Sequence, residues 1–140
     1  LEAYALPLVG RAAECSRSDF GPWLAAAATC LHAAGRVDEA QTLADSLGTM
    51  LEREEYFTVH QFTDLATYYA WTGRPQESLR WLERAAAHTP HRIEWVFASG
   101  LYDPVRSDAE FRRGLERLKR QTRDRLQARW AMLGGGGSGR

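Results

Sequence analysis

Cysteine is scarce in this sequence, and long apolar runs are missing. The 140 residues include two cysteines, Cys15 and Cys30, and neither belongs to a Cys-x-x-Cys pair. Two cysteines cannot form the framework of a disulfide-rich domain, so we expect reduced thiols in a cytoplasmic protein, with one disulfide as the alternative. No apolar run approaches the ~20 residues of a membrane-spanning helix, and the first residues lack the pattern of a signal peptide. We therefore expect no membrane span.

The sequence also has no excess of charge of either sign. It contains 18 basic and 18 acidic side chains, which excludes a strong overall attraction to nucleic acid or to membranes. The charge is unevenly distributed, however. Residues 111–130 contain eight basic and two acidic residues, a local net charge of +6.

Motifs that carry catalytic chemistry are missing as well. There is no Gly-x-Ser-x-Gly turn, no phosphate-binding loop that ends in Gly-Lys-Ser/Thr and no dinucleotide fingerprint. No His-x-x-x-His or His-Glu-x-x-His pair occurs among the histidines His32, His60, His88 and His91. We therefore expect a protein that is not an enzyme and has no cofactor and no bound metal.

Helical periodicity dominates what is present, and no alternating strand pattern occurs. The sequence predicts an all-α protein, with a weakly defined helix in 1–15 and further helices at about 23–34, 37–51, 57–72, 75–88, 93–100 and from the Ser107 region to Leu133. Because the first residue is not Met, we expect a piece of a longer protein. The tail 134–140 (GGGGSGR) has the composition of a flexible linker, and we expect it to be engineered.

Two glycines divide the helical sequence into pairs of helices. Gly35 and Gly73 can adopt the left-handed conformation that ends a helix, and Pro75 falls in the first turn of the next helix, where it is tolerated. Each glycine is followed by Arg and then by Glu39 or Glu77. The glycines are 38 residues apart, a period that is typical of stacked helix pairs.

The last helix combines a capping signal with a basic, amphipathic pattern. Ser107 and Glu110 stand three residues apart as a capping box, and Gly114 is a mild internal weakness. Apolar residues recur every three or four positions and form one stripe, which arginines flank: Phe111, Leu115, Leu118, Thr122, Leu126 and Trp130.

The second helix pair resembles the tetratricopeptide repeat family. Residues 59–92 match the signature positions of this repeat of about 34 residues at Phe62, Leu65, Ala66, Tyr69, Gly73, Ser78, Leu82, Ala85 and Pro90. The first copy, from Gly21, is looser, because Ala44 stands where a bulky residue is usual; its matches are Leu24, Ala28, Leu31, Gly35 and Ala40. The resemblance implies antiparallel helix pairs that stack as a short right-handed solenoid.

The resemblance also implies the domain organisation. One domain would cover 1–133, with repeats at about 21–54 and 59–92 and a partial repeat with a long capping helix at 93–133. Residues 102–118 (YDPVRSDAEFRRGLERL) are similar to the end of such modules in bacterial multidomain regulators, where an Asp-Pro-x-Arg-Ser-Asp-Pro-x-Phe pattern precedes a closing helix. Ala109 replaces the second proline of that pattern.

In the tetratricopeptide family the first helix of each pair lines a concave groove that binds peptides. The family positions correspond to Thr29, His32, His60, Thr63, Thr67 and Trp71. The basic and amide residues that clamp a peptide carboxylate in some members are replaced here by Ala25 and by threonines, which argues against that mode. Trp71 offers apolar contact to a peptide; the alternative is that it packs on a neighbouring helix.

We therefore expect a non-catalytic protein-interaction module of a larger regulatory protein. It would bind a partner peptide or domain, including other domains of its parent chain, and its exposed stripe would allow self-association. One alternative is a purely structural spacer. Another is a surface for nucleic acid or other anions on the last helix, with nucleic acid the less favoured partner; it would use the basic residues Arg113, Arg117, Arg120 and Arg123.

Overall fold

The computed structural model describes residues 24–53, 59–88, 90 and 93–134. These residues form only helices and turns, with no strand among them, so the all-α prediction is confirmed for this part of the chain. The predicted helix in 1–15 and the tail from 135 lie outside the described residues. The elements are α2 (Leu24–Ala33), α3 (Val37–Glu52), α4 (Val59–Trp71), α5 (Pro75–His88), α6 (Ile93–Ala98), the 3₁₀ helix η4 (Gly100–Val105) and α7 (Ala109–Gly134).

The turns that join α2 to α3 and α4 to α5 have the same backbone structure. Gly35 and Gly73 have φ angles of 79° and 75°, in the left-handed region that a side chain disfavours. In each turn the glycine N–H donates to the carbonyl three residues earlier, and the next N–H donates to the carbonyl five residues earlier, at 2.8 to 3.0 Å. This Schellman arrangement closes the first helix of each pair as predicted.

The same ion pair, between an arginine and a glutamate, follows each of the two turns. Arg36 pairs with Glu39 at 2.5 Å, and Arg74 pairs with Glu77 at 2.7 Å. Both glutamates lie in the first turn of a helix, where the macrodipole favours a negative charge. The two helix pairs therefore match in their contacts as well as in their sequence spacing.

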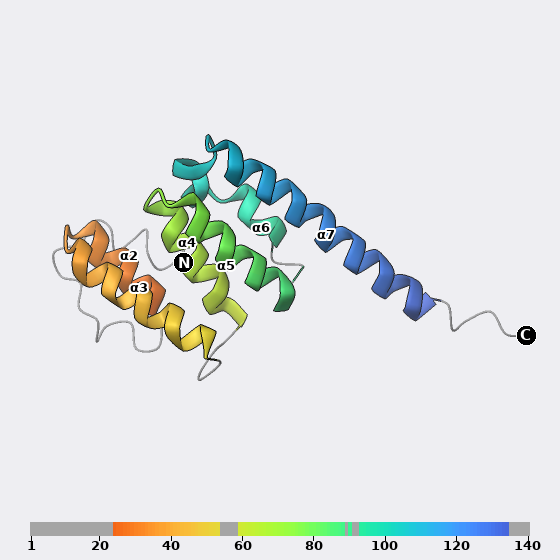
Figure 1. The fold of residues 1–140 in the computed structure, drawn as a ribbon, viewed down its shortest axis with the longest axis horizontal. Helices are drawn as coiled ribbons and strands as arrows, with labels where there is room; N and C mark the ends of the chain where they lie inside the picture. The colour runs from red at the N-terminus through yellow and green to blue at the C-terminus, as the bar shows by residue number, and fades with distance from the viewer. Residues whose placement is uncertain (1–23, 54–58, 89, 91–92, 135–140) are drawn as a thin grey trace, which may run out of the picture.

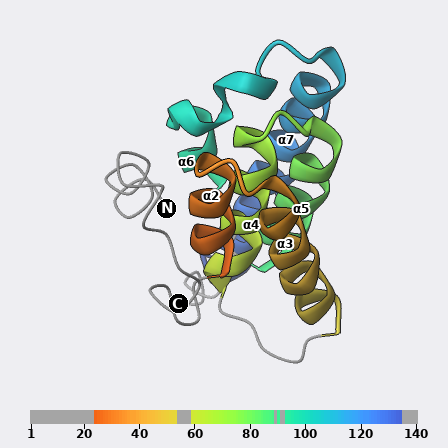
Figure 2. The same ribbon diagram turned by 90° about the vertical axis from the view of Figure 1, so that its left-hand side faces the viewer.

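The two pairs lie side by side, and α4 occupies the centre (Figures 1 and 2). It contacts α5 within its own pair, both helices of the first pair and the 3₁₀ helix η4. Across the α3–α4 boundary, the hydroxyl of Tyr69 donates to Asp45 at 3.3 Å, and the guanidinium of Arg74 donates to Gln41 while it lies 4.8 Å from the centre of the Tyr69 ring. One continuous apolar core joins all the described helices.

The approach to α7 differs from the sequence prediction in two details. Residues 100–105 form η4, which the sequence analysis did not predict, around Pro104. The cap of α7 is Asp108 rather than Ser107, because its carboxylate accepts the Phe111 N–H at 2.7 Å. Asp108 directly precedes Ala109, the first helical residue, and is therefore the position from which a side chain can reach the third N–H of the helix.

Gly114 allows α7 to approach α5 closely. A Cβ atom at this position would lie 2.2 Å from Cδ2 and 3.1 Å from Cγ of Leu79, on α5. Gly114 is buried, and Leu79 packs against the core. The residue that looks like a helix weakness in the sequence is therefore a contact point between two helices.

We predict that Gly114→Ala lowers the free energy of unfolding by about 1 kcal/mol. Overpacking a core costs typically 1–3 kcal/mol, and the ~1 kcal/mol that alanine gains in helix propensity offsets part of this cost. Chemical denaturation followed by circular dichroism measures the change. Gln121→Ala, at an exposed position of the same helix, is the matched control and stays within about 0.5 kcal/mol. In a Leu79→Ala background the cost of Gly114→Ala should shrink; an equal cost there would contradict the proposed contact.

Candidate interaction surfaces

The predicted groove residues lie on the two first helices of the pairs. Thr29 and His32 belong to α2, and the other four residues belong to α4. The structure brings His32 and Trp71 together across the α2–α4 boundary, with their ring centres 5.5 Å apart and the rings at 70°. His32 also pairs with Tyr68, with the ring centres 6.2 Å apart and the rings nearly perpendicular, at 82°. These rings join the two helix pairs on one face.

The three threonines of the predicted groove are buried. The Thr29 hydroxyl donates to the Ala25 carbonyl at 2.8 Å, and the Thr67 hydroxyl donates to the Thr63 carbonyl at 2.8 Å. The oxygen of Thr67 also lies 3.0 Å from the hydroxyl of Tyr102, on η4. Thr29 and Thr67 therefore have structural hydrogen bonds, and a contact between these threonines and a partner stays a prediction.

The remaining groove residues, His32, His60 and Trp71, are half-buried. Burial lowers the pKa of His32, because desolvation disfavours the charged imidazolium. The Nδ1 atoms of both histidines are buried without a hydrogen-bond partner in the described structure. The accessible part of the predicted groove is thus a small aromatic and imidazole surface.

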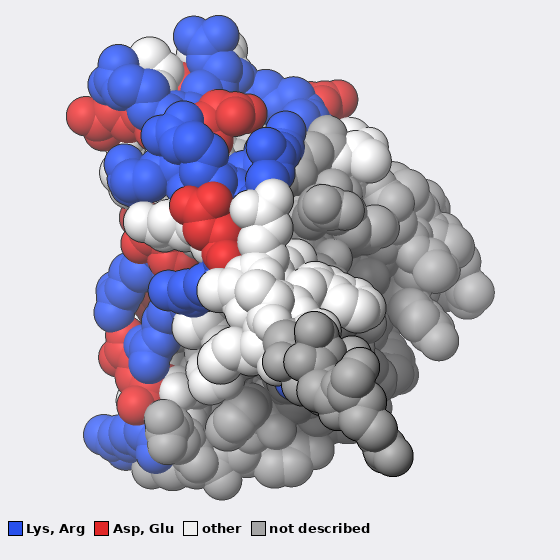
Figure 3. Space-filling view, turned by 90° about the vertical axis from the view of Figure 1, so that its right-hand side faces the viewer, with Lys and Arg blue, Asp and Glu red and all other residues white. Residues whose placement is uncertain are grey.

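The four predicted basic residues are all exposed on α7. Lys and Arg side chains gather across the top of the face in Figure 3, with a few acidic side chains among them. A shallow hollow on this helix is lined by Arg113, Arg117 and Arg120 together with Arg112, Glu116 and Ala109. Arg117 also reaches Glu83 of α5, with 3.4 Å between the charged atoms, so part of the basic charge is balanced within the protein.

The apolar stripe of α7 is buried near the start of the helix and becomes exposed toward its end. Phe111, Leu115, Leu118 and Thr122 are buried, Leu126 is half-buried, and Trp130 is 73% exposed. Leu133, which the sequence analysis did not include in the stripe, is 72% exposed. The spacing of residues could have indicated Leu133, but only the structure shows where the neighbouring helices end.

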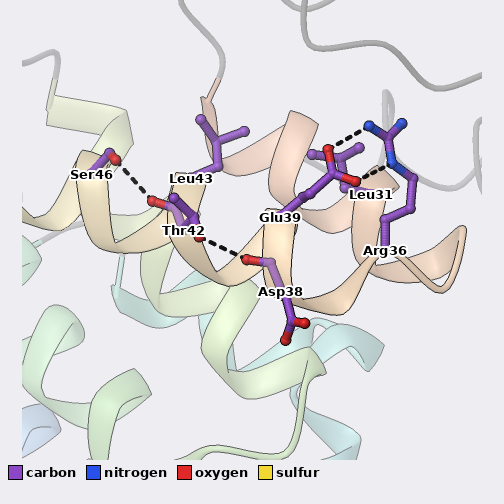
Figure 4. A pocket seen from close by; sticks show the side chains of 7 residues that line it. All are labelled: Leu31, Arg36, Asp38, Glu39, Thr42, Leu43 and Ser46. Atoms are coloured by element: carbon purple, nitrogen blue, oxygen red, sulfur yellow. Dashed lines mark hydrogen bonds and ion pairs between the residues drawn. The ribbon is translucent and has the colours of Figure 1, made fainter.

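Another hollow lies along α3 beside the end of α2 (Figure 4). Its polar groups largely bond to one another: Arg36 pairs with Glu39, Thr42 donates to the Asp38 carbonyl at 2.9 Å, and Ser46 donates to the Thr42 carbonyl at 2.8 Å. Leu31 and Leu43 complete the lining. The hollow is thus lined by polar side chains that make contacts within the protein.

Cys30 corrects one expectation from the sequence. It is disulfide-bonded, and the described residues contain no free cysteine; the expectation of a reduced thiol is therefore wrong for Cys30. Cys15, the other cysteine of the sequence, lies outside the described residues. Cysteine number alone cannot decide such a pairing, because a disulfide requires the fold to bring two Cβ atoms within about 4 Å.

Two features are absent from the described residues: a cluster of metal-binding side chains and a membrane-spanning helix. No group of three or more His, Cys, Asp or Glu side chains in this part of the chain could hold a metal ion. No helix in the same residues combines the length and apolar character that crossing a membrane requires.

No model of a protein family, no curated protein and no solved structure matches the chain. The tetratricopeptide family therefore stays a resemblance, based on the matching residues of the sequence.

We predict that His32 makes the stability depend on pH. Its pKa is lowered in the folded protein, so the unfolded chain binds the proton more readily below its ordinary pKa of about 6.5. The stability that the neutral ring contributes is therefore fully present above that pH and is lost as the pH falls through the lowered pKa. Urea titrations between about pH 7 and pH 5 should show a smaller loss for His32→Gln than for the wild type. Parallel curves would contradict this role.

A second prediction concerns the buried bond between Thr67 and Tyr102. Because the Thr67 hydroxyl donates to a carbonyl of its own helix, the Tyr102 hydroxyl must donate in the contact between them. Tyr102→Phe should cost about 1 kcal/mol, and Thr67→Val about 1–3 kcal/mol because it leaves a buried hydroxyl without a partner. The double variant should show a coupling of about 1 kcal/mol. Additive costs would show that the bond contributes nothing.

Proposed function

We propose that the chain is a non-catalytic protein-interaction module built from tetratricopeptide-like helix pairs. In this proposal the pairs form a short right-handed solenoid, with α7 as the capping helix. The repeated glycine turns and the repeated Arg–Glu pairs after them support the repeat. The sequence resemblance to bacterial regulators supports a place within a larger regulatory protein.

The contact between His32 and Trp71 carries this proposal. It places two half-buried rings on the face where the first helices of both pairs meet, and His60 lies three turns before Trp71 on the same side of α4. Aromatic side chains are common anchors of protein interfaces. The occupant is an extended peptide segment of a partner protein that presents an apolar side chain to these rings.

The compartment is a separate part of the proposal. The scarcity of cysteine predicts a cytoplasmic protein, whereas the disulfide at Cys30 favours an oxidising compartment. A thiol assay of protein purified from its native source, with free thiols blocked at lysis, would distinguish the two.

We predict that peptides selected on the intact chain from a random displayed library contain an apolar or aromatic anchor and depend on Trp71. Trp71→Leu should weaken their binding at least about tenfold, which corresponds to about 1.4 kcal/mol. Met132→Ala removes an exposed apolar side chain of α7 that lies outside the apolar stripe and should leave the affinity unchanged. Thermal melts would establish that both variants are folded.

The other outcomes of this experiment contradict the proposal in distinct ways. Binding that survives Trp71→Leu and is lost in a further variant, Trp130→Leu, would move the binding surface to α7. A failure to enrich any peptide above an unrelated control protein would favour the structural spacer.

A further inference from the structure

The second half of α7 extends past the helices that cover its first half (Figure 1). Phe111, Leu115 and Leu118 are buried in the core, where α7 packs against α5. Leu126, Trp130 and Leu133 continue the stripe at intervals of four and three residues, which keeps them on the same face of the helix. From Leu126 onward this face becomes progressively exposed among the described residues.

A small cavity lies where the stripe leaves the core. It has a volume of about 130 Å³ and lies between Ile93, at the start of α6, and one face of α7; its lining from α7 comprises Lys119, Thr122, Arg123, Leu126, Gln127 and Trp130. Sites for drug-sized ligands have volumes of ~300–1,000 Å³. This cavity is smaller, and although polar residues contribute to its lining, most of its surface is apolar, which suits an inserted side chain of a partner.

Basic residues border the exposed part of the stripe on both sides. Residues 119–134 include five basic residues and one acidic residue, a net charge of +4. Arg123 precedes Leu126 by three residues and Arg129 precedes Leu133 by four, so the two arginines lie next to the stripe on opposite edges. Both arginines are exposed. A partner that covers the stripe would therefore bring its flanks next to positive charge.

We infer that the second half of α7 docks an acidic amphipathic helix of a partner protein. An apolar residue of that helix inserts between Ile93 and Trp130, others cover Leu126 and Leu133, and acidic residues on its flanks pair with Arg123 and Arg129. This surface lies on a different element from the His32–Trp71 face, so the inference does not depend on the proposed peptide groove.

The shape and charge of the surface favour this occupant over two others. The stripe is narrow, as in the seam between two paired helices, whereas a helix that lies on a membrane has a broad apolar face. A second copy of α7 would bring the same basic flanks against each other, and facing like charges disfavour such pairing. An acidic helix satisfies both the apolar and the charged parts of the surface.

The test uses the intact 140-residue chain and a fluorescent helical peptide of about 20 residues, long enough to form an isolated helix. The peptide has Leu at the a and d positions of each heptad and Glu at e and g; a second peptide has Lys at e and g. Fluorescence anisotropy should show binding of the Glu peptide and none of the Lys peptide. Trp130→Ser combined with Leu133→Ser should weaken binding at least tenfold, about 1.4 kcal/mol.

Charge-reversal variants distinguish specific docking of the peptide from nonspecific electrostatic attraction. Arg123→Glu with Arg129→Glu should abolish binding of the Glu peptide and create binding of the Lys peptide. Arg113→Glu with Arg120→Glu makes the same change in net charge on the opposite face of α7, and should reduce binding of the Glu peptide much less. All of these side chains are exposed, so circular dichroism should show unchanged folding.

Several results would overturn the inference. Equal losses in the two charge-reversed variants would mean that net charge alone attracts the peptide. Trp130-dependent binding to mixed phosphatidylcholine and phosphatidylserine vesicles, without binding of the Glu peptide, would assign the surface to membranes. A dimer in sedimentation experiments that Trp130→Ser dissociates would assign it to a second copy, and salt-sensitive binding of duplex DNA without peptide binding would assign it to nucleic acid.

Discussion

The need to cover α4 from every side determines the rest of the described structure. Between Gln61 and Ala70 every residue of this helix except Asp64 is buried. A helix that is buried all round requires neighbours in several directions, and here α2, α3, α5 and η4 supply them. Buried polar groups of α4 then require partners inside the protein, a requirement that the Thr63 hydroxyl and the Nδ1 atom of His60 do not meet in the described structure. The hydroxyl of Thr67 meets this requirement through its own helix and through Tyr102.

The same constraint explains why the outer helices have two different faces. Each outer helix is covered where it meets the next layer and is open on its other side, unless a further element covers it. For α7 this boundary falls within a single helix, because its first half lies on α5 and its second half extends beyond it (Figure 1). The apolar stripe of α7 continues beyond the part of the helix that packs against α5. That mismatch, rather than the basic charge alone, makes α7 a candidate interaction surface.

Local sequence patterns predicted much of the fold, but they could not predict contacts between residues that are far apart in the sequence. The turns at Gly35 and Gly73 were predictable because a glycine after an apolar helical stretch is itself the cause of the left-handed turn. Ser107 was predicted as the cap because Glu110 stands three residues later, whereas the cap is Asp108, because the first helical residue is Ala109. Gly114 was misread because helix propensity does not include Leu79, which precedes it by 35 residues.

The candidate interaction surfaces were even harder to predict from local sequence patterns than the fold. A threonine at helical spacing looks polar and therefore accessible, but its hydroxyl can bond to the carbonyl four residues earlier and so enter a core at little cost. Thr29 and Thr67 do this, and no local pattern distinguishes them from exposed threonines. The stripe of α7 was predictable as a face, because periodicity defines a face. Its division into a packed half and an open half was not, because that depends on where α5 and α6 end, and the open half is the part that can bind a partner.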